Sequence, residues 1–175
     1  MGFQSFSSAK VLSIVAVMTA LVYVMTSISV RMPPPLGAWH IGDVASFIAS
    51  ILFGPLIGAF ASGVGAALFD VWNPLWGSSF IIWALPTLII RGSMGYLLGR
   101  YRRLFSGSVL ASDLAAMALS HVWKNFGYFL YDYYLFGAVA YFDLATFFLL
   151  SAVDIAVATP LLRAIRGAIG REYVM

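Results

Sequence analysis

Residues 42–72 of the chain read GDVASFIASILFGPLIGAFASGVGAALFDVW. An apolar run lies on each side of Gly54-Pro55, and this dipeptide predicts a tight reversal between two helices. The second run is rich in small residues, and its Gly58-xxx-Ser62 spacing lets helix backbones approach closely in lipid. The stretch therefore predicts two short helices that pack closely together inside a membrane.

The composition extends this prediction to the whole chain. Of the 175 residues, 62% are hydrophobic and 10% are charged, and the mean hydropathy is +0.93. An average soluble domain is about half apolar and about a quarter charged. Since a soluble fold of this size could not bury so much apolar surface, we expect lipid to be the solvent for much of the chain. The first apolar run is not followed by a small-residue cleavage site and a soluble domain, which favours a retained helix over a removed signal peptide.

Turn residues and prolines divide the chain into six apolar segments. A membrane-spanning helix needs roughly 20 apolar residues, or fewer where other helices cover it. The three prolines at 33–35 end the first segment, because proline cannot continue a helix. We predict an all-α integral membrane protein, a single domain over residues 1–175 that forms a bundle of six transmembrane helices, and we find no strand pattern. The predicted helices cover approximately residues 9–30, 43–53, 55–72, 79–100, 109–131 and 142–166.

The positions of the cations predict the orientation of the bundle. With six spans, both termini and the loop after the fourth helix lie on the same side, and this side carries most of the positive charge. Its cations are Lys10, Arg100, Arg102, Arg103, Arg163, Arg166 and Arg171. The loops of the opposite side carry Arg31. By the positive-inside rule, the termini are cytoplasmic and the loops at 31–42, 73–78 and 132–141 face outwards.

The fifth predicted helix carries a polar face. His121, Asn125 and Tyr128 are spaced i, i+4, i+7, so they lie on one side of the helix, with Lys124 beside them. Ionisable groups inside a membrane usually face protein or a wet cavity, because exposure to lipid is costly. This face is therefore the main candidate for the wall of a binding site, although Lys124 alone is also compatible with a side chain that extends to the membrane surface.

Other helices bring polar and aromatic groups to a similar depth. Arg91 and Asp154 lie near the middle of the fourth and sixth helices, and they are either a buried ion pair or ligand contacts. Asp70, at the outer end of the third helix, is either an interfacial residue or a ligand contact. Trp83 and Trp123 offer flat apolar surfaces, and small-molecule sites combine such a lining with a few placed polar groups.

The residues match a known family of transport proteins. Residues 42–72 resemble helices two and three of the vitamin-specific S components of energy-coupling-factor (ECF) transporters, and of the riboflavin and hydroxymethylpyrimidine branch in particular. The shared features are a Gly-Asp start, a Phe-Gly-Pro reversal, a glycine-rich third helix and an Asp at its outer end, here Asp70. Residues 84–99, ALPTLIIRGSMGYLLG, resemble the fourth helix of this family, in which a basic residue followed by Gly lies inside the span, here Arg91-Gly92.

The resemblance covers the size and the six-helix layout of the chain, and it implies a function. An S component captures a small water-soluble vitamin or precursor from outside, in a pocket of helices four to six that the loop between helices one and two closes, here 31–41. The Ala16-xxx-Ala20 motif resembles the patch that docks on a transmembrane T component, and two cytoplasmic ATPases complete this ABC importer. The resemblance also implies a location in the cytoplasmic membrane of a prokaryote.

From these lines we predict the site. The substrate-binding candidates are Trp39, His40, Asp70, Trp83, Arg91, His121, Lys124, Asn125, Tyr128 and Asp154. The sequence does not name the substrate. Arg91, Lys124 and His121 suit an anionic or acceptor-rich ligand, and Trp83 suits a flat ring.

The chain lacks the sequence motifs of several other classes of protein. The chain has no GxxxxGK[ST] pattern for ATP hydrolysis, no HExxH pattern of a zinc protease and no convincing GxSx pattern of a serine protease. It has no cysteine and two histidines at different predicted depths, which argues against a metal or haem site. We therefore expect no enzyme activity, no cofactor and no nucleic-acid partner. An autonomous small secondary transporter stays open as the alternative, because Arg91, Lys124 and Asp154 could form a proton relay.

Overall fold

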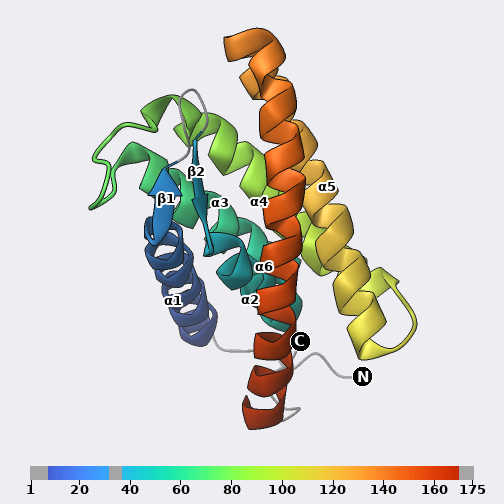
Figure 1. The fold of residues 1–175 in the computed structure, drawn as a ribbon. Coiled ribbons are helices and arrows are strands. Elements are labelled where there is room, and N and C mark those ends of the chain that lie inside the picture. Colours follow the sequence, from blue (N-terminus) through green and yellow to red (C-terminus); the bar gives the residue numbers. More distant parts are fainter. Residues whose placement is uncertain (1–7, 32–36, 170–175) are drawn as a thin grey trace.

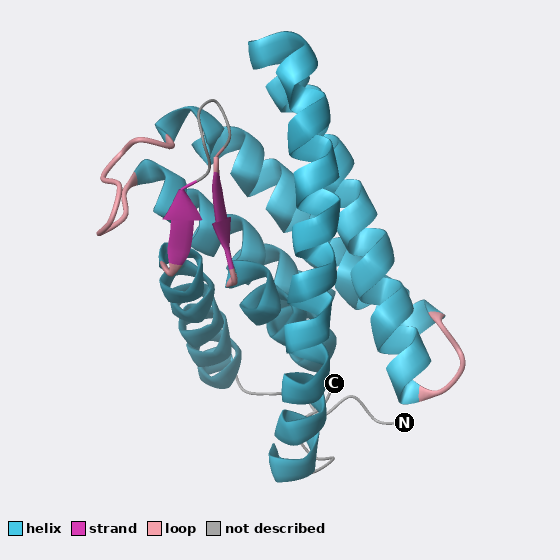
Figure 2. Cartoon of the chain, viewed as in Figure 1, coloured by secondary structure: helices cyan, strands magenta, loops and turns pink. Residues whose placement is uncertain are grey.

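The structure, a computed structural model, describes residues 8–31 and 37–169 (Figure 1). These residues are almost entirely helical, which confirms the all-α class (Figure 2). Two 3-10 turns precede the fourth and sixth α-helices. The elements in chain order are α1 (Ser8–Ser27), β1 (Ser29–Arg31), β2 (Ala38–His40), α2 (Gly42–Phe53), α3 (Pro55–Val71), η1 (Ile81–Trp83), α4 (Ala84–Leu104), α5 (Val109–Phe136), η2 (Gly137–Val139) and α6 (Ala140–Ile169).

A short antiparallel hairpin, β1–β2, follows α1, and the sequence had predicted no strand. Val30 lies opposite Trp39, and each strand has three residues. Strands this short show no alternation that a sequence pattern could detect. The first helix therefore ends at Ser27 rather than at 30, and part of the predicted loop at 31–41 lies outside the described residues.

The reversal between α2 and α3 has a strict backbone requirement. Gly54 has a φ of 93°, a conformation that residues with a side chain rarely adopt, and Pro55 occupies the first turn of α3. A Cβ atom on Gly54 would also lie 2.5 Å from an Arg103 guanidinium nitrogen. Glycine therefore allows α2 and α3 to turn sharply beneath the end of α4.

Glycines also bring α3 and α4 into close contact. A Cβ atom added to Gly99 would lie 2.6 Å from Pro55 Cα, and one added to Gly95 would overlap the carbonyl group of Gly58. Backbones can approach this closely only where side chains are absent, which is how small residues act in membrane helices. The glycine-rich sequence of α3 and α4 thus produces a tightly packed pair.

The core lies around α2, which is the most enclosed helix. Ten of its 12 residues are buried, and Phe47 and Leu52 pack with Leu98 of α4, Met117 of α5 and Leu162 of α6. The outer surface is apolar, since side chains such as Leu56 and Tyr134 are 75% and 83% exposed. An apolar surface around a partly polar interior suits a lipid environment.

Three helical stretches are long and apolar enough to cross a membrane. They are Ser8–Ser27, Ile81–Leu104 and Val109–Ala168, and the last contains α5, η2 and α6. The apolar helices α2 and α3 are shorter than a full span. These stretches indicate a multi-pass membrane protein, whereas the six crossings remain a prediction.

Two helices, α4 and α5, extend well beyond their predicted ends. The helix α5 continues to Phe136, so most of the predicted loop at 132–141 is helical, and the chain turns at Gly137, whose φ is 64°. The helix α4 extends to Leu104, so the predicted basic loop at 100–103 forms its last turn. Neither segment contains a proline, so each helix continues until a glycine or a polar loop ends it.

The two ends of the bundle differ in what they contain. The start of α1, the α4–α5 connection and the end of α6 lie at one end, and the hairpin and the α5–α6 turn lie towards the other (Figure 1). At the first end, Asp113 of α5 forms ion pairs with Arg102 of α4 and Arg166 of α6. The cavity described next lies near the hairpin.

Candidate functional site

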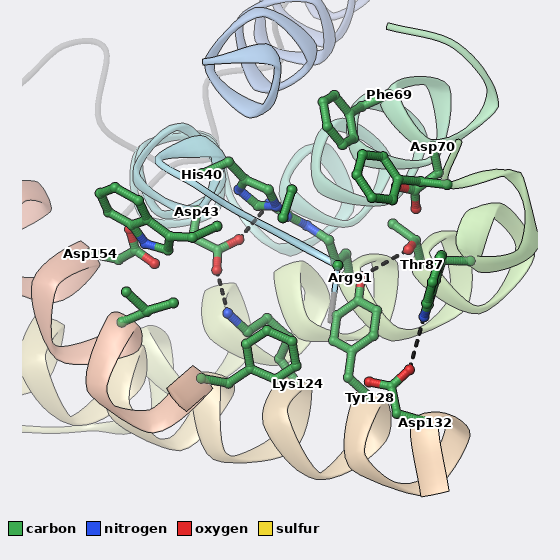
Figure 3. A pocket seen from close by; sticks show the side chains of 17 residues that line it. His40, Asp43, Phe69, Asp70, Thr87, Arg91, Lys124, Tyr128, Asp132 and Asp154 are labelled. Atoms are coloured by element: carbon green, nitrogen blue, oxygen red, sulfur yellow. Dashed lines mark hydrogen bonds and ion pairs between the residues drawn. The ribbon is translucent and has the colours of Figure 1, made fainter. Parts of the chain in front are cut away.

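A cavity lies beside the hairpin, between β2 and the helices α2 to α6 (Figure 3). Seven elements supply its polar and aromatic walls, and each contributes one to three side chains. The main lining residues are Trp39 and His40 of β2, Asp43 of α2, Phe69 and Asp70 of α3, Trp83 of η1, Thr87 and Arg91 of α4, Lys124, Tyr128 and Asp132 of α5, and Phe147 and Asp154 of α6. The cavity therefore joins segments that are far apart in the sequence.

Asp43 lies at the centre of the charged groups. Its carboxylate accepts a hydrogen bond from Lys124 Nζ at 2.5 Å and forms an ion pair with Arg91. The same carboxylate lies 3.2 Å from His121 Nε2. The Asp43 side chain is 1% exposed, so an unpaired charge there would be costly, and the two cations offset that cost. This cluster ties together α2, α4 and α5.

Arg91 also connects the helices to the hairpin. Its Nη1 lies 3.1 Å from His40 Nε2, and its Nη2 donates to Ser46 Oγ at 3.3 Å. Burial, followed by the positive charge of Arg91, lowers the pKa of His40 from 6.5 to about 3. His40 is therefore neutral at physiological pH, so one of its ring nitrogens is an acceptor: Nδ1 faces the Gly42 backbone N–H at 3.3 Å, and Nε2 faces the Arg91 guanidinium.

Aromatic rings form the other walls. The rings of Phe69 and Phe80 stack at 5.6 Å between centroids, and Trp83 packs against Phe80 at 6.1 Å. Trp83 Nε1 donates to Asp132 Oδ1 at 2.9 Å, and Tyr128 donates to Thr87 Oγ1 at 2.9 Å. A cavity with these surfaces and a few fixed polar groups suits a small flat molecule.

Apart from Asp43 Oδ1, which forms an ion pair with Arg91, two carboxyl groups of the cavity have a buried oxygen without a hydrogen-bond partner among the described residues. These atoms are Asp70 Oδ2 and Asp154 Oδ1, and Trp39 Nε1 is a buried donor in the same condition. Asp154 and Asp70 lie on different sides of the cavity, with Arg91 between them in Figure 3. Because buried polar atoms in proteins are almost always paired, these three are candidates for contact with a ligand.

The cavity contains eight of the ten residues that the sequence proposed. These are Trp39, His40, Asp70, Trp83, Arg91, Lys124, Tyr128 and Asp154. His121 lies behind Asp43, with its ring 4.7 Å from that of Phe47, and Asn125 donates to Ser151 at 3.0 Å instead. Neither residue lines the cavity, because their helix face turns partly towards α2 and α6.

Three further expectations need correction. Arg91 pairs with Asp43, whereas the sequence had offered Asp154 as its partner. Lys124 is buried against the same carboxylate and does not extend to the membrane surface. Trp123 is 51% exposed and donates to Ser93 Oγ, so it lies outside the cavity. The first two corrections follow from the central position of Asp43.

Asp43, Thr87 and Asp132 are cavity residues that sequence reasoning missed. Asp43 is in the first turn of α2, and a helix-start role already explained an acid there. Asp132 continues the polar face of α5, since it is four residues after Tyr128. Extending the spacing of that face by one step would have found it.

One cluster beside the cavity has the donor atoms of a metal site. Asp43, His121 and Asp154 offer ligand atoms that lie within 4.8 Å of one another. However, Arg91 and Lys124 already contact the Asp43 carboxylate, and their positive charges oppose a metal ion at this point. The arrangement fits an internal ion-pair cluster better than a metal centre.

The fold and the cavity together define a class: a multi-pass helical membrane protein with a buried polar site for a small molecule. The family model described as "ECF-type riboflavin transporter, S component" matches residues 6–170. The chain therefore belongs to the S component family of ECF transporters, whose members are substrate-binding transport subunits and not enzymes.

One curated relative is similar over part of the chain. It is the "Uncharacterized protein in gap 3'region" of Pyrococcus woesei, which is 37% identical over 107 residues. The match covers 56% of this chain and 67% of the relative.

Proposed function

We propose that the chain captures a small water-soluble vitamin or vitamin precursor from the outer side of the membrane and delivers it through an ECF-type ABC importer. In addition to the family membership, one observation supports this proposal, namely the cavity near the hairpin. Charged, aromatic and unpaired polar groups converge there from seven elements. Such a site has no role in a purely structural subunit.

The hairpin gives the proposed site an entrance that can close. Residues 37–40 of the predicted loop at 31–41 line the cavity, and Arg91 contacts His40 from the opposite wall. We propose that this loop covers the bound substrate. Its contact with the central ion-pair cluster would couple the position of the loop to the occupancy of the cavity.

The distribution of charge supports the proposed orientation. Arg102, Arg163 and Arg166 lie near Asp113, at the end of the bundle far from the cavity. By the positive-inside rule, that end faces the cytoplasm, and the cavity then opens outwards. We accordingly propose six transmembrane helices, cytoplasmic termini and a location in the cytoplasmic membrane of a prokaryote.

The proposed partners are a transmembrane T component and two cytoplasmic ATPases. Ala16 and Ala20 are exposed on α1, and exposed alanines form a smooth surface on which a second helix can pack. Alanine loses no side-chain rotamers on docking, so association there has a low entropic cost. We propose this face of α1 as the docking surface.

An autonomous secondary transporter is the second candidate. The buried charges of Asp43, Arg91, Lys124 and Asp154 favour it, because ionisable groups inside membranes often mark ion pathways.

Co-expression separates the two candidates. An affinity-tagged chain is produced together with the T component and ATPases of an ECF transporter, and the purified complex is tested for ATP-dependent substrate uptake in proteoliposomes. The proposal predicts a four-subunit complex and uptake that stops without ATP. If the chain purifies alone and drives uptake alone, it is a secondary transporter.

A further inference from the structure

A second cavity lies at the end of the bundle far from the hairpin, where α5 begins and α6 approaches its end (Figure 1). Its volume is about 280 Å³, which is far more than one water molecule needs. The residues that line it are Val109, Leu110 and Asp113 of α5 and Thr159, Arg163 and Arg166 of α6. We call this cavity the arginine recess. The proposed capture function gives it no role.

The arginine recess carries more positive than negative charge. Arg102 and Arg166 both form ion pairs with Asp113, and Arg166 Nη2 donates to Asp113 Oδ1 at 3.1 Å. Arg163 is exposed, and it forms no ion pair or side-chain hydrogen bond with any other residue that the structure describes. One carboxylate therefore faces three guanidinium groups, and the net positive charge favours an anionic ligand.

Asp113 positions two of the guanidinium groups and leaves them donors to spare. Its side chain is 6% exposed, and it accepts hydrogen bonds from Arg102 Nε and from both Nη atoms of Arg166. A guanidinium has five N–H donors in one plane, so several remain on each of these arginines. Such planar sets of donors match the oxygen atoms of a phosphate group.

An apolar strip continues from the recess along the same two helices. Leu114 lies one turn after Leu110 on α5 and is 37% exposed. On α6, Ala156 lies seven residues before Arg163, so the two share a side of the helix, and Ala156 is also exposed. Both helices belong to the stretch Val109–Ala168, which is long and apolar enough to cross a membrane. The charged recess therefore adjoins a surface that suits hydrocarbon.

We propose that the arginine recess binds the headgroup phosphate of an anionic phospholipid. Arg163 and Arg166 contact the phosphate, and the acyl chains lie along Leu114 and Ala156. A lipid fits better than a soluble anion, because the charged and apolar surfaces adjoin on helices suited to a membrane, and basic pockets between such helices bind lipid headgroups. This site is separate from the cavity near the hairpin, so its failure would leave the proposed capture function unchanged.

Two short-chain lipids and one free anion test the proposal. They are dioctanoyl-phosphatidylglycerol, which is anionic, dioctanoyl-phosphatidylcholine, which has the same chains and no net charge, and inorganic phosphate. The full chain is purified in a non-ionic detergent, bound lipid is counted by native mass spectrometry, and the unfolding midpoint is recorded at each concentration. We expect phosphatidylglycerol to bind at least about tenfold more tightly than phosphatidylcholine. Inorganic phosphate should raise the midpoint less than phosphatidylglycerol does at the same concentration.

The variant Arg163→Gln locates the contact. Without lipid, its unfolding midpoint should equal that of the unmodified chain, because Arg163 is exposed and pairs with no other described residue. Its preference for phosphatidylglycerol over phosphatidylcholine should fall to about twofold or less, because charge-assisted hydrogen bonds are lost. Arg100→Gln is the matched control, since Arg100 is an exposed arginine in the last part of α4 and does not line the recess. This control should keep the tenfold preference, and the comparison of lipids on the unmodified chain decides the proposal if a variant fails to fold.

Four outcomes would overturn the lipid site. Equal binding of the two lipids means that the recess does not select an anionic headgroup. If inorganic phosphate stabilises the chain as much as phosphatidylglycerol does, the recess is a site for a soluble anion. An equal loss of preference in Arg163→Gln and Arg100→Gln assigns the effect to the general charge of this end of the bundle. If Arg163→Gln keeps the lipid preference but no longer co-purifies with the T component, the recess binds an acidic segment of a partner protein instead.

Discussion

Asp43 is the residue on which the site depends. One buried carboxylate meets Arg91, Lys124 and His121, which come from two other helices. Removal of one member of a buried ion pair leaves an uncompensated charge, and the cost is greater than the net stabilisation by the pair itself. The sequence showed each of these residues, but it did not show that they meet.

Asp43→Asn should therefore destabilise the fold strongly. We expect the free energy of unfolding in detergent to fall by about 3–5 kcal/mol, because Arg91 and Lys124 lose their shared counter-charge. Asp113→Asn is the comparison, since Asp113 also pairs with two cations, Arg102 and Arg166, but these are 24% and 18% exposed. Water can solvate them, so a smaller loss is expected. Equal losses in the two variants would contradict a central role for Asp43.

His40 should make stability depend on pH. Its pKa is about 3 in the folded protein and 6.5 as the ordinary value, so the folded state binds fewer protons than the unfolded state between these values. The contribution of neutral His40 is complete above pH 6.5, and it is lost as the pH falls towards 3. We expect the unmodified chain to lose about 1 kcal/mol more than His40→Gln between pH 7 and pH 5.5. Parallel stability curves from denaturant titrations would exclude this role.

At the scale of the elements, the close contact of α3 and α4 is the feature most open to test. Gly95→Val would force a side chain against the Gly58 carbonyl group, and overpacking of this kind costs about 1–3 kcal/mol. Gly167→Val is the control, because Gly167 lies in α6 with no atom within 4 Å of an added Cβ. Thermal unfolding in detergent compares the two variants. A lower midpoint for Gly167→Val than for Gly95→Val would contradict the close packing.

The proposed docking surface on α1, which carries Ala16 and Ala20, is also tested by single substitutions. Ala16→Trp and Ala20→Trp should leave substrate binding unchanged and should abolish co-purification with the T component, because the bulky ring separates the two helices. Val17→Trp is the matched control, since Val17 is 64% exposed on a neighbouring side of α1. Loss of substrate binding in the alanine variants would mean that this face does not serve docking.

The elements that the sequence predicted correctly are those that short local patterns determine, such as turn residues and apolar runs. Gly54-Pro55 turns the chain between α2 and α3, and the apolar runs on both sides form helices. The hairpin was missed because its two strands have three residues each. The end of α5 was placed too early, since the aromatic residues before Gly137 continue the helix.

Sequence patterns predicted most of the charged and aromatic residues of the site, but they did not predict which of these residues form ion pairs. The helical spacing of Lys124 and Tyr128 placed both on a polar face, and both line the cavity. The partner of Lys124 is 81 residues away in the sequence, and no local pattern connects them. A pairing of this kind depends on how α2, α4 and α5 pack, so Asp43 was identified as a helix-start acid and Arg91 was left with two possible roles.

For the whole molecule, the central claim is that a bundle with an apolar outer surface encloses a site for one small water-soluble molecule. The apolar surface and the buried polar cluster have the same cause, because charged groups avoid lipid and gather where protein surrounds them. A ligand that binds the folded state alone must stabilise it. Stability therefore reports directly on capture.

The most direct test is a thermal-shift screen of the purified chain against water-soluble vitamins and their precursors. At 100 times its dissociation constant, a true substrate should raise the free energy of unfolding by about 2.7 kcal/mol. We expect stabilisation by one compound, or by a few closely related compounds. An unchanged unfolding midpoint with every compound in the panel would contradict a capture subunit for vitamins.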